Sequence, residues 1–242
     1  MWTYLLILFS LVGLVAVFVH RLVVLRRKPV VVEEVVEEEE ELPEKRRMSA
    51  DEKLSVEELC KKGKSHLDYG KDDEAIKCFV QALALNPNHQ ETAHALAVLY
   101  LKKEMFSASA ALFKQLAAMT DDPAHYSNLG YVLFLQSDFG EALKAYHYAL
   151  SLDDSRAARF MSLAQVYREM GRNYHALMAM QKAADLEEEN VDFKLVLADL
   201  YGRIGDLPKG LAVVEEVLGM KADYEPAKEM KVEFKRRFRQ GS

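Results

Sequence analysis

Cysteine is scarce in this sequence, with only Cys60 and Cys78 among its 242 residues. The two form no C-x-x-C pair and no spaced framework, which excludes a small fold held together by several disulfides. Disulfides persist mainly in oxidising compartments, so we expect two reduced thiols in a reducing one.

The sequence also lacks an excess of basic residues. It has 32 lysines and arginines against 38 aspartates and glutamates, which gives a net charge of −6. Proteins that bind nucleic acid need a clustered basic surface to neutralise the phosphates. We therefore do not expect nucleic acid to be the main partner.

Motifs for catalysis and for metal binding are missing as well. The chain contains no H-E-x-x-H, no glycine-rich phosphate loop and no G-x-S-x-G. No two of its seven histidines stand four residues apart on one helix, and Asp72-Asp73 and Asp121-Asp122 lie where turns need capping. We expect no enzymatic activity, no bound metal and no cofactor.

A long apolar run is present at the start of the chain. Residues 2–25 are apolar with few exceptions, and a helix needs about 20 such residues to cross a bilayer. Trp2 and Tyr4 suit the aromatic belt of one interface, and Arg21 can extend to the other. A cleaved signal peptide is the alternative, but no basic residue precedes the run and no small-x-small site follows it. We expect residues 1–25 to form an uncleaved transmembrane anchor.

The basic residues that flank this run all lie on its C-terminal side. They are Arg21, Arg26, Arg27 and Lys28. Basic flanks remain on the cytoplasmic side of a membrane, so we expect a single-pass protein whose large C-terminal domain is cytoplasmic.

Residues 26–54 are predicted to be a charged linker. Their valines and glutamates give no helical apolar face, and the like charges repel one another. We interpret the segment as a solvated spacer, and the alternative is a contact between its basic runs and lipid. Ser55 and Glu58 then have capping-box spacing, which predicts that the first helix of the folded domain begins at Ser55.

The remainder of the chain repeats one pattern of two short helices. Residues 55–224 contain five segments of 33 or 34 residues, at 56–89, 90–122, 123–156, 157–190 and 191–224. The eighth position of each segment is small: Gly63, Ala97, Gly130, Ala164 and Ala198. The twentieth position is also small: Ala75, Ser109, Ala142, Ala176 and Gly210. A larger side chain follows four residues later: Phe79, Phe113, Tyr146, Met180 and Val214.

These columns resemble the tetratricopeptide repeat family, whose signature includes a Leu-Gly pair and an Ala-x3-Phe step with a period of about 34 residues. The resemblance implies an all-α solenoid of antiparallel helix pairs with a concave groove that docks proteins or peptides. Stacking supplies the core, because one repeat cannot bury its apolar face alone. Gly70, Gly171 and Gly205 fall at the turns, where a left-handed conformation is expected.

Residues 225–240 are predicted to form a C-terminal capping helix. Ala227, Met230, Phe234 and Phe238 recur at three- and four-residue steps and give one apolar stripe. The opposite face is rich in lysine and arginine. The alternative interpretation is a basic amphipathic helix that binds an acidic lipid surface.

Helical geometry predicts which face of each first helix is free to bind a partner. Positions two, six, nine and thirteen lie opposite the packed face, flanked by five and twelve. The predicted groove residues are Val98, Leu101, Tyr131, Phe134, Leu135, Met161, Gln165, Arg168, Leu195 and Asp199. An exposed apolar floor of this kind is typical of a protein or peptide site. Two alternatives remain: position twelve belongs to the core, or the chain's own linker fills the groove.

Together these features predict a non-enzymatic, membrane-tethered scaffold that binds a protein or peptide. Tethering raises the effective concentration of the captured partner at the membrane. One alternative is an envelope or pilus assembly factor whose repeats lie outside the cytoplasm, which the basic flank opposes. Another is a structural protein whose solenoids stack end to end.

Overall fold

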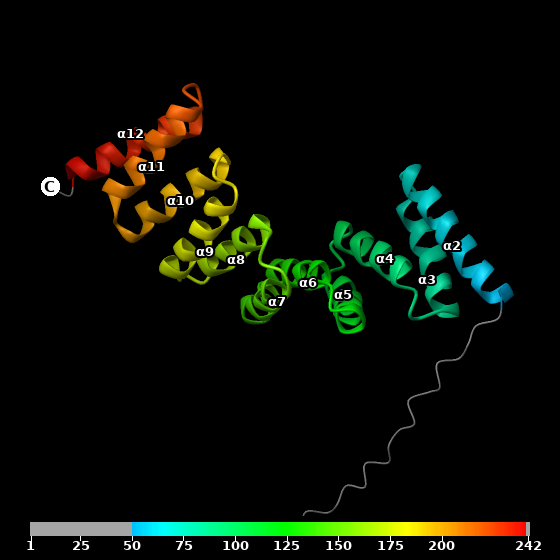
Figure 1. Cartoon of the computed structure of the whole chain (residues 1–242). Helices are drawn as coiled ribbons and strands as arrows, with labels where there is room; N and C mark the ends of the chain where they lie inside the picture. The colour runs from blue at the N-terminus through cyan, green and yellow to red at the C-terminus, as the bar shows by residue number, and fades with distance from the viewer. Residues whose placement is uncertain (1–49, 241–242) are drawn as a thin grey trace, which may run out of the picture. The chain divides into compact units, whose positions relative to one another are not determined.

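The computed structural model describes residues 50–240, with side chains from residue 55 onward. Every helix or strand in that range is an α-helix (Figure 1). The helices are α2 (Ala50–Asp68), α3 (Asp72–Leu85), α4 (Gln90–Lys102), α5 (Phe106–Thr120), α6 (Pro123–Leu135), α7 (Phe139–Leu152), α8 (Ala157–Glu169), α9 (Asn173–Leu186), α10 (Val191–Ile204), α11 (Leu207–Met220) and α12 (Glu225–Gln240). The predicted anchor at residues 1–25 lies outside the described part of the chain. None of the described helices is both long enough and apolar enough to cross a membrane.

Ten of these helices pack as five consecutive pairs, from α2 with α3 to α10 with α11, and the second helix of each pair contacts the first helix of the next (Figure 1). The last helix, α12, packs on α11. This is the predicted all-α solenoid of five helix pairs followed by one further helix. Its contacts join elements close in sequence, as expected when stacked repeats share one core.

Two details of the predicted helix starts are wrong. The first helix begins at Ala50 rather than Ser55, because residues 50–54 are good helix formers without glycine or proline. Asp72 and Asp73 do not cap α3 either, since its N-cap is Lys71 without a side-chain bond. Both aspartates lie in the first turn of α3 and pair with lysines at the end of the next helix: Asp72 with Lys102 and Asp73 with Lys103.

The predicted columns of small and large residues meet inside the helix pairs. Phe79 is fully buried and Tyr146 nearly so. A Cβ atom added to Gly63 would lie 2.4 Å from Cε1 of Phe79, and one added to Gly130 would lie 3.0 Å from Cε2 of Tyr146. The aromatic ring of the second helix therefore occupies the space that a side chain at position eight would need.

The turn inside every pair uses a left-handed residue at position fifteen. Gly70, Gly171 and Gly205 have φ angles of 69°, 71° and 87°. Glu104 and Ser137 occupy the same position with φ angles of 59° and 62°. The predicted glycine turns are confirmed, and the geometry persists in two repeats that lack glycine, where an L-residue is strained.

The connection between the second and third pairs is unusually short. Only Asp121 and Asp122 separate α5 from α6, because α5 continues to Thr120 and Pro123 already begins α6. Asp121 is left-handed with φ 46°, and Asp122 caps α6 by accepting a bond from the backbone N of Ala124 at 2.8 Å. Proline at the first helical position completes a rigid junction between these repeats.

Candidate functional site

A pocket of about 310 Å³ opens between the first helices of the third and fourth pairs. Its walls come from one face of α6, from the loop before α8 and from α8 itself. The residues that give it chemical character are Asn128, Tyr131, Tyr146, Arg156, Arg159 and Ser162. We name it the α6–α8 pocket.

Tyr146 forms the buried part of this pocket. Burial raises the pKa of its phenol to about 12, so the hydroxyl keeps its proton at any physiological pH. Ser162 of α8 lines the same pocket. Tyr146, which packs the core of the third repeat, therefore also presents a neutral hydroxyl at the base of the pocket.

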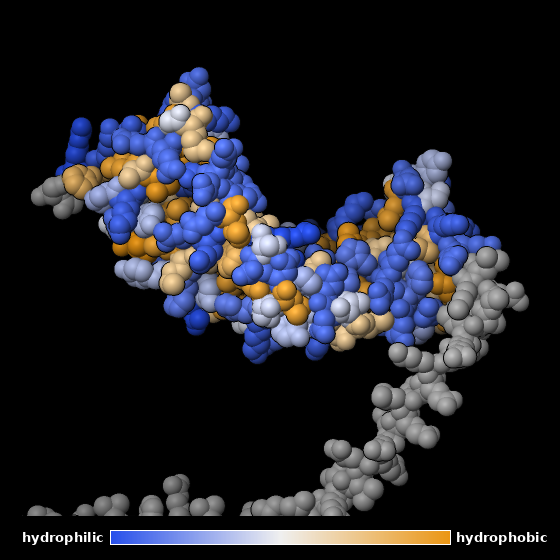
Figure 2. Space-filling view, viewed as in Figure 1, coloured by the Kyte–Doolittle hydropathy of each residue, from blue (hydrophilic) through white to orange (hydrophobic). Residues whose placement is uncertain are grey.

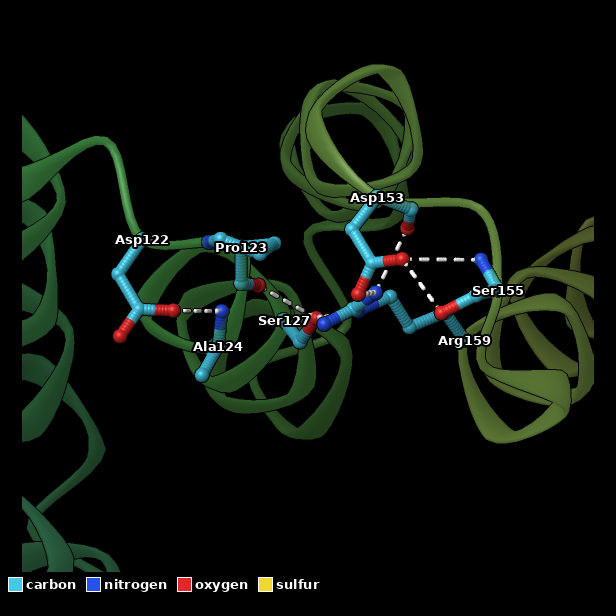
Figure 3. A network of polar contacts seen from close by, with 7 residues as sticks. All are labelled: Asp122, Pro123, Ala124, Ser127, Asp153, Ser155 and Arg159. Atoms are coloured by element: carbon cyan, nitrogen blue, oxygen red, sulfur yellow. Dashed lines mark hydrogen bonds and ion pairs between the residues drawn. The ribbon is translucent and has the colours of Figure 1, made fainter.

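A buried arginine network builds one wall of the pocket (Figure 3). Arg159 is only 6% exposed. It donates to the backbone oxygen of Asp153 at 2.6 Å, to Oδ2 of Asp153 at 2.5 Å and to Oγ of Ser127 at 3.3 Å. The Ser127 hydroxyl donates in turn to the backbone oxygen of Pro123 at 2.8 Å. The network ties α6, the α7–α8 connection and α8 together, and it leaves Arg159 fully engaged within the protein.

The carboxylate of Asp153 should make stability depend on pH. The Ser155 hydroxyl and the Arg159 guanidinium hold the pKa of Asp153 well below its usual range. A lowered pKa stabilises the fold above the unfolded pKa, near 3.8, and this contribution fades as the pH falls below that value. We expect Asp153→Asn to lower the free energy of unfolding at pH 7 and the difference from wild type to shrink in acid. Urea denaturation of both proteins between pH 7 and pH 3 measures this.

Asp154→Asn is the matched control for that prediction. Asp154 is the exposed neighbour of Asp153, and its side chain forms no bond to any described residue. Equal losses for the two variants, or a loss that does not change with pH, would contradict the role given to Asp153.

A second, smaller hollow lies on the other side of α8. It has a volume of about 60 Å³ and is lined by Met161, Ala164, Gln165, Arg168, Val196 and Leu200 of α8 and α10. Ser162 in the first pocket and Gln165 in the second lie one helical turn apart. The two hollows therefore flank one strip of α8. Apolar residues are exposed among polar ones on the surface over α5 to α8 (Figure 2).

Four of the predicted groove residues line these hollows: Tyr131, Met161, Gln165 and Arg168. Val98 and Leu135 are exposed but line neither. Asp199 forms an ion pair with Arg203 at 2.6 Å on its own helix.

The other three predicted residues are partly buried. Leu101, Phe134 and Leu195 pack against buried clusters of their repeats. Phe134 also contacts the ring of Phe139, with centroids 5.8 Å apart. These three residues line neither hollow, whereas Met161 and Arg168, at the same positions five and twelve of the fourth repeat, line the smaller one. The partial burial of Leu101 and Phe134 agrees with the alternative that position twelve belongs partly to the core.

Several pocket residues were not among the predicted ones. Asn128 and Ser162 occupy position six, which helical geometry places on the free face, but the prediction favoured apolar side chains. Arg156 lies in the connection before α8, and Arg159 is at position three. The pattern of free positions does not identify these two arginines, because Arg156 lies in a loop and position three is not on the free face.

Charge in the α6–α8 pocket is only partly compensated. Arg159 is paired with Asp153, whereas the exposed side chain of Arg156 forms no ion pair with a described residue. Within residues 55–240, no group of three or more His, Cys, Asp or Glu side chains is placed to hold a metal ion. Cys60 and Cys78 are buried free thiols.

Stacked helix pairs with hollows along their first helices define a helical-repeat scaffold. Family models described as tetratricopeptide repeat match residues 56–89, 94–158 and 157–190. These matches together cover more than half of the sequence, and the chain belongs to the tetratricopeptide repeat family.

Comparison with individual proteins agrees with this membership. The chain is similar to Superkiller protein 3 of Schizosaccharomyces pombe, with 21% identity over 156 residues that span 61% of this chain and 11% of that protein. A crystal structure of MamA has a TM-score of 0.66 and 21% identity, covering 72% of this chain and 97% of that one. The structure of YrrB, described as a TPR protein with an unusual peptide-binding site, has a TM-score of 0.62 and 16% identity, covering 74% and 97%. At these identities the structural likeness shows the fold alone.

Proposed function

We propose that the protein is a membrane-tethered scaffold that binds a segment of a partner protein across the first helices of its third to fifth repeats. The observation that carries the proposal is the pair of hollows on either side of the strip formed by Ser162 and Gln165. A segment lying along this strip can place one side chain in each hollow. Membership of a family that generally binds proteins and peptides supports this function.

The chemistry of the hollows restricts the segment. The α6–α8 pocket offers the hydroxyl of Tyr131, the amide of Asn128 and the uncompensated guanidinium of Arg156. The smaller hollow offers apolar side chains from Met161 and Val196. A segment with a polar or acidic residue near an apolar one satisfies both, because the polar groups of the first pocket need hydrogen-bond partners once a ligand covers them.

Tethering rests on the sequence of the first 28 residues. Their apolar run suits an anchor, and their basic flank favours a cytoplasmic repeat domain. A scaffold fixed in this way concentrates its partner near the membrane without needing high affinity. Reporters that are active only inside or only outside the cytoplasm, fused after Ser242, test the orientation. Activity of the external reporter would overturn it.

Charge reversal at the pocket tests the binding face. Tyr131 is 46% exposed on α6, and Tyr174 is 67% exposed on α9 away from both hollows. We expect proteins that co-purify with the full chain from its native cells to be lost with Tyr131→Glu and retained with Tyr174→Glu. Both variants should keep the wild-type helical circular dichroism. Equal capture by the two variants would contradict the assignment of this face.

A further inference from the structure

A third and larger recess lies on the opposite side of α6. It has a volume of about 530 Å³ and is walled by α5, α6 and α7. On α6, the α6–α8 pocket uses Ala124, Asn128 and Tyr131, whereas this recess uses Tyr126 and Leu133. At about 100° per residue the two sets point in opposite directions from the helix axis. We name this recess the outer groove.

The outer groove follows from two small residues in the second repeat. Position twenty-one is Ile76, Leu143, Leu177 and Leu211 in the other four repeats but Ala110 in this one. Position twenty-eight is leucine in three of the others, and here it is Ala117. Both alanines line the recess. The recess between α5, α6 and α7 is therefore lined by alanine at two positions where the other repeats mostly carry larger side chains.

The lining combines an apolar floor with one cationic wall. Leu129 and Leu133 of α6 form the floor, together with the alanines. Lys114 on α5 forms no ion pair with any described residue, whereas Lys144 on the facing α7 is paired with Glu141 at 2.5 Å. The wall on the α5 side thus carries a positive charge that the described residues do not neutralise.

An aromatic pair is also part of the groove. The rings of Tyr126 and Tyr148 contact each other with centroids 4.3 Å apart, and both residues line the recess. Tyr148 remains 45% exposed. Rigid aromatic surface beside an apolar floor is typical of the centre of a protein interface.

We propose that the outer groove docks an amphipathic helix of a partner protein, with apolar residues on its inserted face and a carboxylate beside them for Lys114. All three walls are helices, so no free strand edge is available to pair with an extended peptide. A helix satisfies its own backbone and needs only side-chain contacts. From Ala110 to Ala118 the α5 wall extends about 12 Å, a little more than two helical turns.

This second site is distinct from the binding face proposed above, because α6 separates the two. A partner on the first helices and another in the outer groove can bind at once. The scaffold would then bring together two proteins, one on each side of the third repeat. Failure of one site leaves the other testable, since Tyr131→Glu changes only the first site and Ala110→Leu only the second.

The test is selection of helical peptides by the full chain. The probe is a displayed library of alanine-based peptides of about 15 residues, near the lower length limit for isolated helices. Positions i, i+4 and i+7 vary among leucine, isoleucine, phenylalanine and methionine, and a flanking position varies among Glu, Gln and Lys. We expect selected peptides to carry Glu at the flanking position.

Three variants decide where the selected peptides bind. Ala110→Leu restores the residue of the other repeats and fills the groove, so it should weaken binding at least about ten-fold. Lys114→Glu should reverse the preference from Glu to Lys, and Lys182→Glu, an exposed lysine on α9, should leave affinity unchanged. No enriched peptide, or binding unaffected by Ala110→Leu, overturns the proposal. Concentration-dependent self-association that Ala110→Leu abolishes also overturns it, because the occupant is then a second copy of this chain.

Discussion

Replacing Phe234 with alanine should lower the free energy of unfolding of the last repeat by about 3–5 kcal/mol. Phe234 of α12 is only 2% exposed. Its ring lies in a space left by two glycines of the fifth repeat: Cβ atoms added to Gly202 and Gly210 would approach the ring to 2.7 Å and 2.6 Å. The two glycines supply no side chain to fill that space, so truncation leaves a cavity at the end of the solenoid.

Phe238→Ala is the matched control, because it removes the same side chain one turn further along α12. Phe238 is 52% exposed, so the predicted apolar stripe of α12 is buried only in part, and we expect a loss below about 1 kcal/mol. Urea denaturation followed by circular dichroism compares the two. Similar losses would show that Phe234 does not hold the capping helix in place.

The loss at Phe234 should also be local. In a repeat array each unit contacts mainly its neighbours, so a defect at one end destabilises that end first. Arg237 donates to the backbone oxygen of Gly202 at 2.7 Å and depends on the same docking. Hydrogen exchange should therefore speed up in α10 to α12 and remain at the wild-type rate in α4 to α7. Uniform acceleration would indicate a single cooperative unit instead.

Features set by residues close in sequence were predictable. Small and large residues such as Gly63 and Phe79 recur with the period of the repeat. This recurrence predicts both the pairing of the two helices and the contact between these two residues. The cap of α7 is also local, because the Oδ1 of Asp138 accepts from the backbone N of Glu141, three residues later, at 3.2 Å. The turn geometry at Glu104 and Ser137 was missed because neither is glycine, although both stand at position fifteen.

Features that depend on the size of side chains between helices were harder to predict from the sequence. The helical positions used to predict the free face selected both Tyr131, which is exposed, and Phe134, which is partly buried. Position alone does not say how far a neighbouring repeat covers a side chain. The outer groove could in principle have been predicted, because Ala110 and Ala117 are smaller than the residues at the same positions in most other repeats. Its openness depends on how α5 and α7 are spaced, and the column pattern carries no such information.

Gly63→Ala should destabilise the first repeat by about 2 kcal/mol, although alanine is the better helix former by about 1 kcal/mol. The added Cβ would lie 2.4 Å from Cε1 and 2.7 Å from Cδ1 of Phe79. Phe79 is fully buried, so its ring cannot move aside without displacing other core side chains. The steric cost therefore exceeds the gain in helix propensity.

A double-mutant cycle separates this clash from a general weakness of the repeat. Phe79→Leu shortens the ring side chain, so the double variant should be more stable than the sum of the two single losses, with a coupling of about 1 kcal/mol or more. Chemical denaturation of the four proteins measures it, and additive losses would refute the contact. Ala97, in the same column of the second repeat, gives the opposite comparison. There we expect alanine to be more stable than glycine, so Ala97→Gly should lower the free energy of unfolding by about 1 kcal/mol. The column requires a small residue, and the position of the facing aromatic ring determines whether alanine or only glycine fits.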